Sequence, residues 1–385
     1  MMAARGPVLA IMILAIAALG TATFFMRSTG DATTESSSSS AQTSSTAVAT
    51  FLAEAATTEF EPLRGEWTLS LPRDHGAHLE ARAETWSVTA HLVASTGEKF
   101  DLSLSFARYG IIPPNEAAEM STWTVSEIYA GQFLVFEGSE GTGHTEHRFS
   151  RGAGTAGHDP ETKEIWLDEW NIVYGEGAGD EGIRLRASGV NVLIDLLLEP
   201  RKPALTASDE ATATTRGFSM PRLAVSGAIR TPSDEFDVSG TAWLDRLWGD
   251  VPVPGGPIAY DRLTLQLSDG TDMSVIQTRR IGRAGAATLD GVLVDEAGRA
   301  AYLDNDALQI EVLEERRAIG GGSYPVSWQV RGEGFDLTAT ASTENARQEF
   351  IAPMWLGPVA VEGEMDGAAV RGSGMLLLTG YEDRP

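Results

Sequence analysis

The chain of 385 residues contains no cysteine. This absence excludes disulfide bonds, thiol catalysis, zinc–thiolate sites and a lipidated N-terminal cysteine. Its folded part therefore has to take its stability from a hydrophobic core. The length exceeds what one small core serves, so we expect two domains.

Positive charge is scarce. Lysine and arginine number 29 against 54 aspartates and glutamates, which gives a formal net charge of -25. Nucleic-acid binding depends on cationic neutralisation of phosphates, and adsorption to anionic lipid depends on a basic patch. We therefore expect no nucleic-acid partner. The acidic surface is typical of a soluble body that its own charge keeps dispersed.

Common nucleophile and nucleotide motifs are also missing. The sequence has no Gly-x-Ser-x-Gly elbow, no P-loop and no dinucleotide fingerprint on a strand–helix unit. These absences argue against nucleophilic hydrolysis and against nucleotide chemistry. We expect no cofactor.

All six histidines lie in the first half of the chain. His75 and His78 form one group beside acidic residues, and His144, His147 and His158 form another in a glycine-rich region. Imidazole and carboxylate are metal ligands when they converge on one point. Hydrogen-bonded or solvated loops explain both groups more simply, so we expect no metal site.

The N-terminal residues 1–27 form a signal peptide or a membrane anchor. Ala18 and Gly20 suit a signal peptidase, whereas the apolar run 7–26 has about 20 residues, enough to span a bilayer as a helix. Either alternative places the remainder outside the cytoplasm. We expect a periplasmic protein, tethered to the inner membrane by residues 7–26 if the segment stays uncleaved.

Residues 28–50 are rich in serine and threonine and contain almost nothing apolar. Such a composition cannot bury enough surface to offset the loss of chain entropy. We interpret this segment as a disordered linker that holds the folded body away from the membrane.

Alternation of apolar and polar residues dominates the rest of the chain. Residues 86–93, 100–106 and 263–267 follow this pattern, which is typical of strands with one buried face. Asp269-Gly270 lies between two alternating runs and predicts a hairpin. Many short strands with regular turns indicate an all-β protein of sandwiches or barrels.

A loop-like segment interrupts the alternating pattern near the middle of the chain. The segment 207–217 is small and polar, and it follows a proline-rich end of the first strand set. We place the domain boundary at about 200–217, with one antiparallel barrel in 51–205 and a second in 217–385. Each range is long enough for an eight- to ten-stranded barrel.

The segment Thr241–Gly249 concentrates the most informative chemistry. It places Asp245 between the indoles of Trp243 and Trp248, and Tyr260-Asp261 opens the next strand. A carboxyl group among aromatics is costly to bury unless it is protonated or paired. With no histidine nearby, acid–base chemistry here would fall to Asp245 and Asp261. The plainer alternative is core packing, with Asp245 in a turn or paired with Arg246.

Several segments resemble the AttH-type, lipocalin-like family, which includes carotenoid 1,2-hydratases. The resemblance covers about residues 71–381. It rests on these segments taken together and in order: Leu-Pro-Arg-Asp-His-Gly-Ala-His at 71–78, Phe-Ser-Arg-Gly-Ala at 149–153, Pro-Arg-Leu-Ala-Val-Ser-Gly at 221–227, Gly-Thr-Ala-Trp-Leu-Asp-Arg at 240–246, Leu-Gln-Leu-Ser-Asp-Gly at 265–270 and Leu-Thr-Gly-Tyr at 378–381.

The resemblance implies two consecutive lipocalin-like barrels with a cavity for an apolar molecule near their interface. In the hydratases an aspartic acid is thought to protonate an isolated double bond before water adds. Asp245 and Trp248 match the hydratase stretch Asp-His-x-Trp-Gly, but Arg246 stands where histidine is expected. A guanidinium cannot shuttle a proton. Tyr260-Asp261 matches a downstream aromatic–acid element less closely.

An earlier family stretch, Glu-Trp-Trp-Tyr, corresponds to Glu84-Thr85-Trp86-Ser87. Glu84 and Trp86 are kept, and two aromatics are lost. These departures weaken the expectation of hydratase activity more than that of the fold. Our leading hypothesis is therefore an exported protein that binds a hydrophobic or lipid-like ligand, accessory to an ABC-type export or lipid-handling system with transporter membrane components as partners.

The alternative hypothesis is an enzyme of the carotenoid 1,2-hydratase or cyclase type acting on a polyene or terpenoid. A third is a structural scaffold with solid barrels. If the protein is an enzyme, the candidate catalytic acids are Asp245 and Asp261. For the binding protein and for the enzyme alike, the candidate ligand-binding residues are Trp86, Trp243, Trp248, Tyr260 and Arg246.

Overall fold

The computed structural model describes residues 60–121, 123–138, 142–177, 181–206, 214–249, 258–281 and 287–382. The predicted anchor and linker, residues 1–27 and 28–50, lie outside the described residues. Within the described ranges, no helix has the length and hydrophobicity to cross a membrane.

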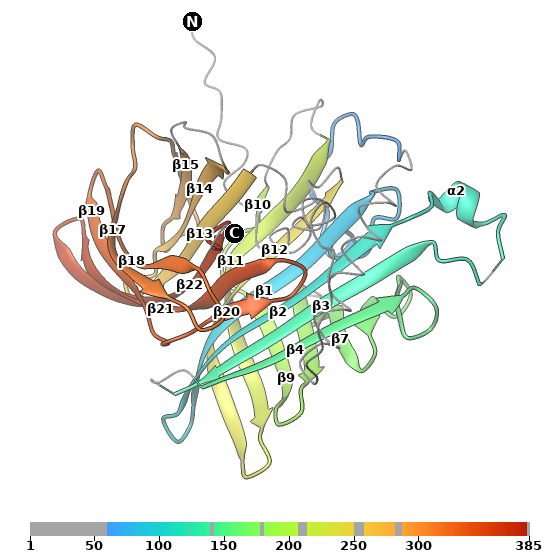
Figure 1. Cartoon of the computed structure of the whole chain (residues 1–385), viewed down its shortest axis with the longest axis horizontal. Helices are drawn as coiled ribbons and strands as arrows, with labels where there is room; N and C mark the ends of the chain where they lie inside the picture. Colours follow the sequence, from blue (N-terminus) through green and yellow to red (C-terminus); the bar gives the residue numbers. More distant parts are fainter. Residues whose placement is uncertain are drawn as a thin grey trace, which may run out of the picture.

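The described residues form two antiparallel sheets, and the predicted all-β class is confirmed (Figure 1). Helical structure is limited to short elements such as α2, Pro114–Ala117, and a 3-10 turn at Arg73–His75. The first sheet is a nearly closed barrel and the second is a half-barrel.

Twelve strands form the first sheet. They are β1 Ala83–Ala94, β2 Lys99–Gly110, β3 Glu127–Glu137, β4 Thr142–Arg151, β5 Ala156–Asp159, β6 Glu164–Leu167, β7 Trp170–Glu176, β8 Gly182–Ser188, β9 Leu193–Pro200, β10 Leu205–Thr206, β11 Thr215–Arg230 and β12 Glu235–Gly249. Their order is β4-β3-β2-β1-β12-β11-β9-β8-β7-β6-β5, with β10 beside β11.

Ten strands form the second sheet. They are β13 Ile258–Leu267, β14 Asp272–Arg280, β15 Thr288–Val294, β16 Ala300–Leu303, β17 Gln309–Arg317, β18 Ser323–Gly332, β19 Phe335–Ala341, β20 Arg347–Glu349, β21 Pro353–Met365 and β22 Ala368–Thr379. Their order is β16-β15-β14-β13-β22-β21-β19-β18-β17, with β20 beside β21. The predicted Asp269-Gly270 turn joins β13 to β14, which pair antiparallel.

The first sheet extends past the boundary that the composition predicts. Strands β11 and β12 follow the loop-like segment, yet β11 pairs with β9 and β12 pairs with β1. The second sheet starts at β13 and not at residue 217. Strands β10 and β11 therefore belong to one sheet, because a polar composition carries no information on which sheet the next strand joins.

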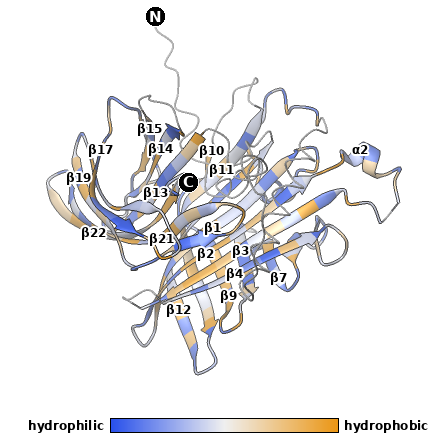
Figure 2. Ribbon diagram, viewed as in Figure 1, coloured by the Kyte–Doolittle hydropathy of each residue, from blue (hydrophilic) through white to orange (hydrophobic). Residues whose placement is uncertain are grey.

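Two hydrophobic clusters form the core. Trp86, Val88 and Leu104 belong to the cluster inside the first barrel. Outward-facing residues of the first sheet, such as Leu247, belong to a second cluster with Leu263 and the rest of the second sheet. Figure 2 shows hydrophobic and hydrophilic residues alternating along the strands. The C-terminal half of β12 is buried on both faces, because one face lines the barrel and the other lies under the second sheet.

Candidate functional site

Strand β12 divides the segment Thr241–Gly249 between two environments. Successive side chains of a strand point to opposite faces. Trp243 and Asp245 face the second sheet, where Asp245 contacts Arg262 of β13. Arg246 and Trp248 face the barrel interior. The candidate residues that are close in sequence therefore belong to two separate sites.

Asp245 is the centre of an ion pair between the two sheets. Its side chain is 6% exposed. Arg262 donates two hydrogen bonds to it, with Nη1–Oδ2 2.7 Å and Nη2–Oδ1 3.0 Å. Trp243 Nε1 donates to Oδ1 at 3.0 Å, and the hydroxyl of Ser219 donates to the same oxygen. Both oxygens act as acceptors, which is the pattern of a carboxylate and not of an acid that donates a proton.

The partner of Asp245 differs from the one that the sequence suggests. The plainer alternative paired Asp245 with its neighbour Arg246. Those two side chains point to opposite faces of β12, and the partner is Arg262, which lies 17 residues away. Nε of Arg262 also donates to the hydroxyl of Ser274 at 3.2 Å, so all three nitrogens of its guanidinium have a hydrogen-bond partner.

Asp261 lies on the other face of β13 from Arg262. Its side chain is fully buried and accepts two hydrogen bonds from Arg279, at 2.7 and 2.8 Å, and one from the hydroxyl of Tyr381 at 2.8 Å. Burial raises the pKa of Asp261, and the arginine and tyrosine contacts oppose this effect. Tyr260 points away from Asp261, because the two are neighbours on one strand.

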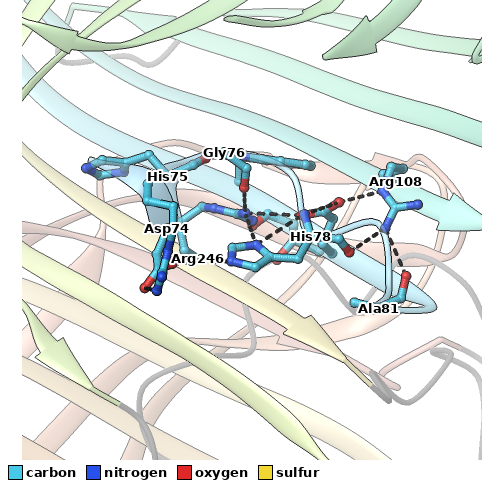
Figure 3. Close-up of polar contacts among 11 residues, drawn as sticks. Asp74, His75, Gly76, His78, Ala81, Arg108 and Arg246 are labelled. Carbon is cyan, nitrogen blue, oxygen red and sulfur yellow. Dashed lines mark hydrogen bonds and ion pairs between the residues drawn. The ribbon is translucent and has the colours of Figure 1, made fainter. Parts of the chain in front are cut away.

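A buried charged cluster occupies the other site, inside the first barrel (Figure 3). Glu84 of β1 accepts hydrogen bonds from Nε of Arg108, from Nη2 of Arg246 at 3.1 Å and from the backbone N–H of His78 at 3.0 Å. Burial alone would raise the pKa of Glu84. The charges of Arg108 and Arg246 and the contact with His78 outweigh burial, so its pKa lies well below the ordinary value.

Arg246 connects the segment before β1 to the barrel. Its guanidinium donates to the carbonyl oxygens of Gly76 and Thr85, each at 2.6 Å. Its central carbon lies 4.0 Å from the ring centre of Trp86 and 5.5 Å from that of Trp248. Burial lowers the pKa of Arg246 to about 10, and Glu84 opposes the shift. These contacts give Arg246 a structural role, which differs from the proton transfer expected of a histidine at this position.

The histidines of the same segment occupy different surroundings. His78 stacks on Trp248, with ring centres 3.9 Å apart. His75 lies at the far end of the group from Arg108 in Figure 3, beside the ring of Phe218 at 5.3 Å. Burial, with the charge of Arg246, lowers the pKa of His75 to about 3. Among the described residues, no group of three or more His, Asp or Glu side chains is arranged to hold a metal ion.

The second histidine group is also dispersed. His147 of β4 contacts the side chain of Gln132 at 3.1 Å and the ring of Phe350 at 4.8 Å. His144 pairs with Glu137 at 3.5 Å, and His158 lies on β5. His144 and His147 therefore contact different residues, and among the described residues these histidines belong to no metal-binding group.

Sequence reasoning missed the arginine partners. Arg262 follows Asp261 directly, and an arginine next to a candidate acid is a signal that could have suggested an ion pair with one of the two aspartates. Arg108 lies opposite Glu84 in the β1–β2 register, which the sequence alone does not reveal. The resemblance pointed to Glu84 as a residue kept from the family stretch, but it did not indicate that Glu84 is the centre of an ion-pair cluster.

The comparisons with known proteins agree on the fold. An AttH protein from Nitrosomonas europaea has a TM-score of 0.71 and 23% identity, over 83% of this chain and 99% of the other. Kievitone hydratase from Nectria haematococca has a TM-score of 0.59 and 14% identity, over 83% and 97%. CghA with Sch210972 has a TM-score of 0.54 and 15% identity, over 85% and 97%.

None of the curated proteins matches this sequence at a significant level. At these low sequence identities, the structural similarities show only that the fold is shared. The AttH-like family model matches residues 62–381, which is most of the chain and includes the whole range over which the sequence resembles the family. The chain therefore belongs to the AttH-like family.

Proposed function

We propose that this protein binds a hydrophobic or lipid-like molecule and does not hydrate it. The observation that supports this most directly is the state of Asp245. Hydration of an isolated double bond requires a proton donor, and Asp245 is engaged as an acceptor by Arg262, Trp243 and Ser219. Arg246 cannot replace it, because a guanidinium stays protonated near neutral pH.

The lipocalin-like fold supports binding of an apolar molecule. Closed and nearly closed barrels of this kind bind ligands in interiors or mouths lined by hydrophobic and aromatic side chains, with a few polar groups for orientation. The two sheets enclose large hydrophobic clusters, and Trp86, Trp243 and Trp248 are all buried in them or beside them.

Extracting natively purified full-length protein with organic solvent and analysing the extract by mass spectrometry tests the proposal. We expect one apolar species at close to one molecule per chain. Extracts that contain no such species, from several gentle preparations and after incubation with lipid extracts, would contradict the proposal and favour a scaffold with solid barrels.

We also propose a cellular setting, which rests on the sequence. Residues 7–26 would tether the protein to the inner membrane, the acidic body would lie in the periplasm, and an ABC-type export or lipid-handling system would be its partner. Fractionation of cells that express the full chain tests the tether. Recovery in the cytoplasmic fraction would contradict it.

A second candidate function is hydration or cyclisation of a polyene or terpenoid. Burial of Asp261 favours it, because a raised pKa is what a carboxylic acid needs to donate a proton. Turnover that disappears in Asp261→Asn and persists in Asp195→Asn would support this candidate. Asp195 is a suitable control, because two arginines also pair with it, at the protein surface.

A further inference from the structure

The connection between β2 and β3 extends away from both sheets. We call it the β2–β3 arm; its described residues are 111–121 and 123–126, and Figure 1 shows it on the right, with α2 near its tip. The arm carries two exposed apolar side chains, since Trp123 is 77% exposed and Met120 is 46% exposed. An indole combines a large apolar ring with one polar N–H, so a partner that covers Trp123 would remove much apolar surface from water.

The arm holds Trp123 in this exposed position. The hydroxyl of Ser121 accepts a hydrogen bond from the backbone N–H of Trp123 at 3.3 Å, and the carbonyl oxygen of Ser121 accepts one from the backbone N–H of Thr124 at 2.8 Å. Arg151 of β4 donates to the carbonyl oxygen of Trp123 at 3.4 Å, and its guanidinium carbon lies 5.7 Å from the indole ring centre. These contacts fix the turn and leave most of the indole in water.

The chain joins the described body beside the root of this arm. Phe60 is the first described residue, and a Cβ added at Gly110, the last residue of β2, would lie 2.5 Å from its ring. The guanidinium carbon of Arg82 also lies 5.8 Å from the centre of this ring. Gly110 directly precedes the arm. The point where the preceding chain joins the body and the root of the arm therefore lie at the same end of the first barrel.

The proposed membrane tether would bring this end of the barrel to the lipid. Residues 27–59, which number 33, separate the apolar run 7–26 from Phe60. A flexible chain of this length has an average end-to-end distance of about 30 Å. Strand β1 has 12 residues and is therefore about 40 Å long. The end that carries Phe60 and the arm consequently reaches the membrane more readily than the opposite end.

The charge and size of the arm indicate the kind of partner. Glu116 and Glu119 of the arm are exposed and the chain has a net charge of -25, so an anionic lipid surface would repel it. Tryptophan is enriched at membrane interfaces, and an arginine such as Arg151 pairs well with phosphate. A stable protein interface covers about 800 Å² of each partner, which is more than two side chains on a turn provide. A zwitterionic lipid surface fits these features best.

We infer that the β2–β3 arm docks the protein on a zwitterionic lipid surface, with Met120 and Trp123 inserted among the head groups. Arg151 would contact a lipid phosphate beside the indole. The inference rests on the proposed tether and names the surface of the folded body that the tether brings to the lipid. Docked in this way, the first barrel points away from the membrane, and Ser95, at the other end of β1, lies far from the lipid.

The absence of cysteine permits a test on the full chain, because one introduced cysteine then carries the only NBD fluorophore. Ala118→Cys places the fluorophore on an exposed residue of the arm, and Ser95→Cys places it on an exposed residue at the opposite end. Each labelled chain is reconstituted with phosphatidylcholine vesicles that contain spin-labelled lipid, which quenches fluorophores close to the bilayer. Flotation with the vesicles establishes that the tether is inserted, and thermal melting establishes that each variant is folded.

We expect severalfold more quenching at position 118 than at position 95. Trp123→Ala in the Ala118→Cys chain should remove most of this difference. Val190→Ala is the matched control and should retain it, because Val190 is 86% exposed but lies in the β8–β9 turn, at the Ser95 end of the sheet. Vesicles of phosphatidylglycerol should quench position 118 less, because the acidic arm is repelled.

Two results would overturn the inference and leave the tether intact. One is equal quenching at the two positions, and the other is quenching at position 118 that Trp123→Ala does not change, in each case in chains that float with the vesicles. Stronger quenching on phosphatidylglycerol than on phosphatidylcholine would also overturn it. Chains that do not float would overturn both the inference and the proposed tether.

Discussion

Replacing Asp245 by asparagine should destabilise the protein strongly, because it leaves Arg262 buried without a counter-charge. Asparagine keeps the size of the side chain and one acceptor oxygen, so the contacts with Trp243 and Ser219 can persist. Its amide group, however, places N–H donors against the N–H donors of the guanidinium, which is itself fully buried. Removing one partner of a buried ion pair costs about 3–5 kcal/mol.

That loss is a large fraction of the stability of a natural protein, which is about 5–15 kcal/mol. Urea unfolding at neutral pH, followed by tryptophan fluorescence, measures the shift in midpoint. Asp195→Asn is the matched control, because Asp195 pairs with Arg184 and Arg186 while being 30% exposed. Exposed pairs contribute about 0–1 kcal/mol, so the control should unfold close to the unmodified protein.

A third variant separates charge from packing. Exchanging the pair for hydrophobic residues, Asp245→Leu with Arg262→Met, should recover most of the loss, because replacing both ions avoids an unpaired buried charge. The reasoning would be refuted if Asp245→Asn unfolded at the same urea concentration as the control. That result would mean that Asp245 is not engaged by Arg262 in solution and is available as an acid.

Three further predictions concern the barrel interior and the glycine on β12. The pKa of His75 is lowered from 6.5 to about 3, so as the pH falls the unfolded chain takes up a proton before the folded protein does. The contribution of neutral His75 to the free energy of unfolding should be fully present above pH 6.5 and should decline between pH 6.5 and about 3. His75→Phe should reduce that decline in thermal melts. Arg246→Ala should cost about 3–5 kcal/mol in urea unfolding, because Glu84 loses one of two buried counter-charges, whereas Arg184→Ala at the surface should cost about 0–1 kcal/mol. Gly240→Ala should lower the melting temperature, because an added Cβ would lie 2.0 Å from the carbonyl oxygen of His91; an unchanged melting temperature would contradict the close approach of β1 and β12.

The strands could be predicted from the sequence because alternation is a local property. The runs 86–93, 100–106 and 263–267 all lie in strands. The pairing of β1 with β12 could not be predicted, because it joins segments more than 140 residues apart and no local sequence pattern encodes that register. The polar composition of 207–217 illustrates the same limit, because it does not reveal whether the strands before and after it join one sheet or two.

The candidate site was predicted in part. The aromatic residues and Asp245 were recognisable by type; the three tryptophans and Asp245 are buried, and Tyr260 is partly exposed. Alternation along β12 could have shown that Asp245 and Arg246 point apart. The identity of the partner could not be predicted, because Arg262 reaches Asp245 from the other sheet. The same holds for the Glu84 cluster, whose arginines come from two strands that flank β1.

The most direct test of the central claim measures binding and turnover in one sample. The natively purified full chain is incubated with its co-purified ligand, or with a polyene alcohol if none is found, and tryptophan fluorescence and the mass of the small molecule are followed together. We predict saturable binding with the mass of the molecule unchanged. Binding followed by a gain of the mass of one water, at a rate that Asp245→Asn abolishes while remaining folded, would contradict the account and identify the protein as a hydratase.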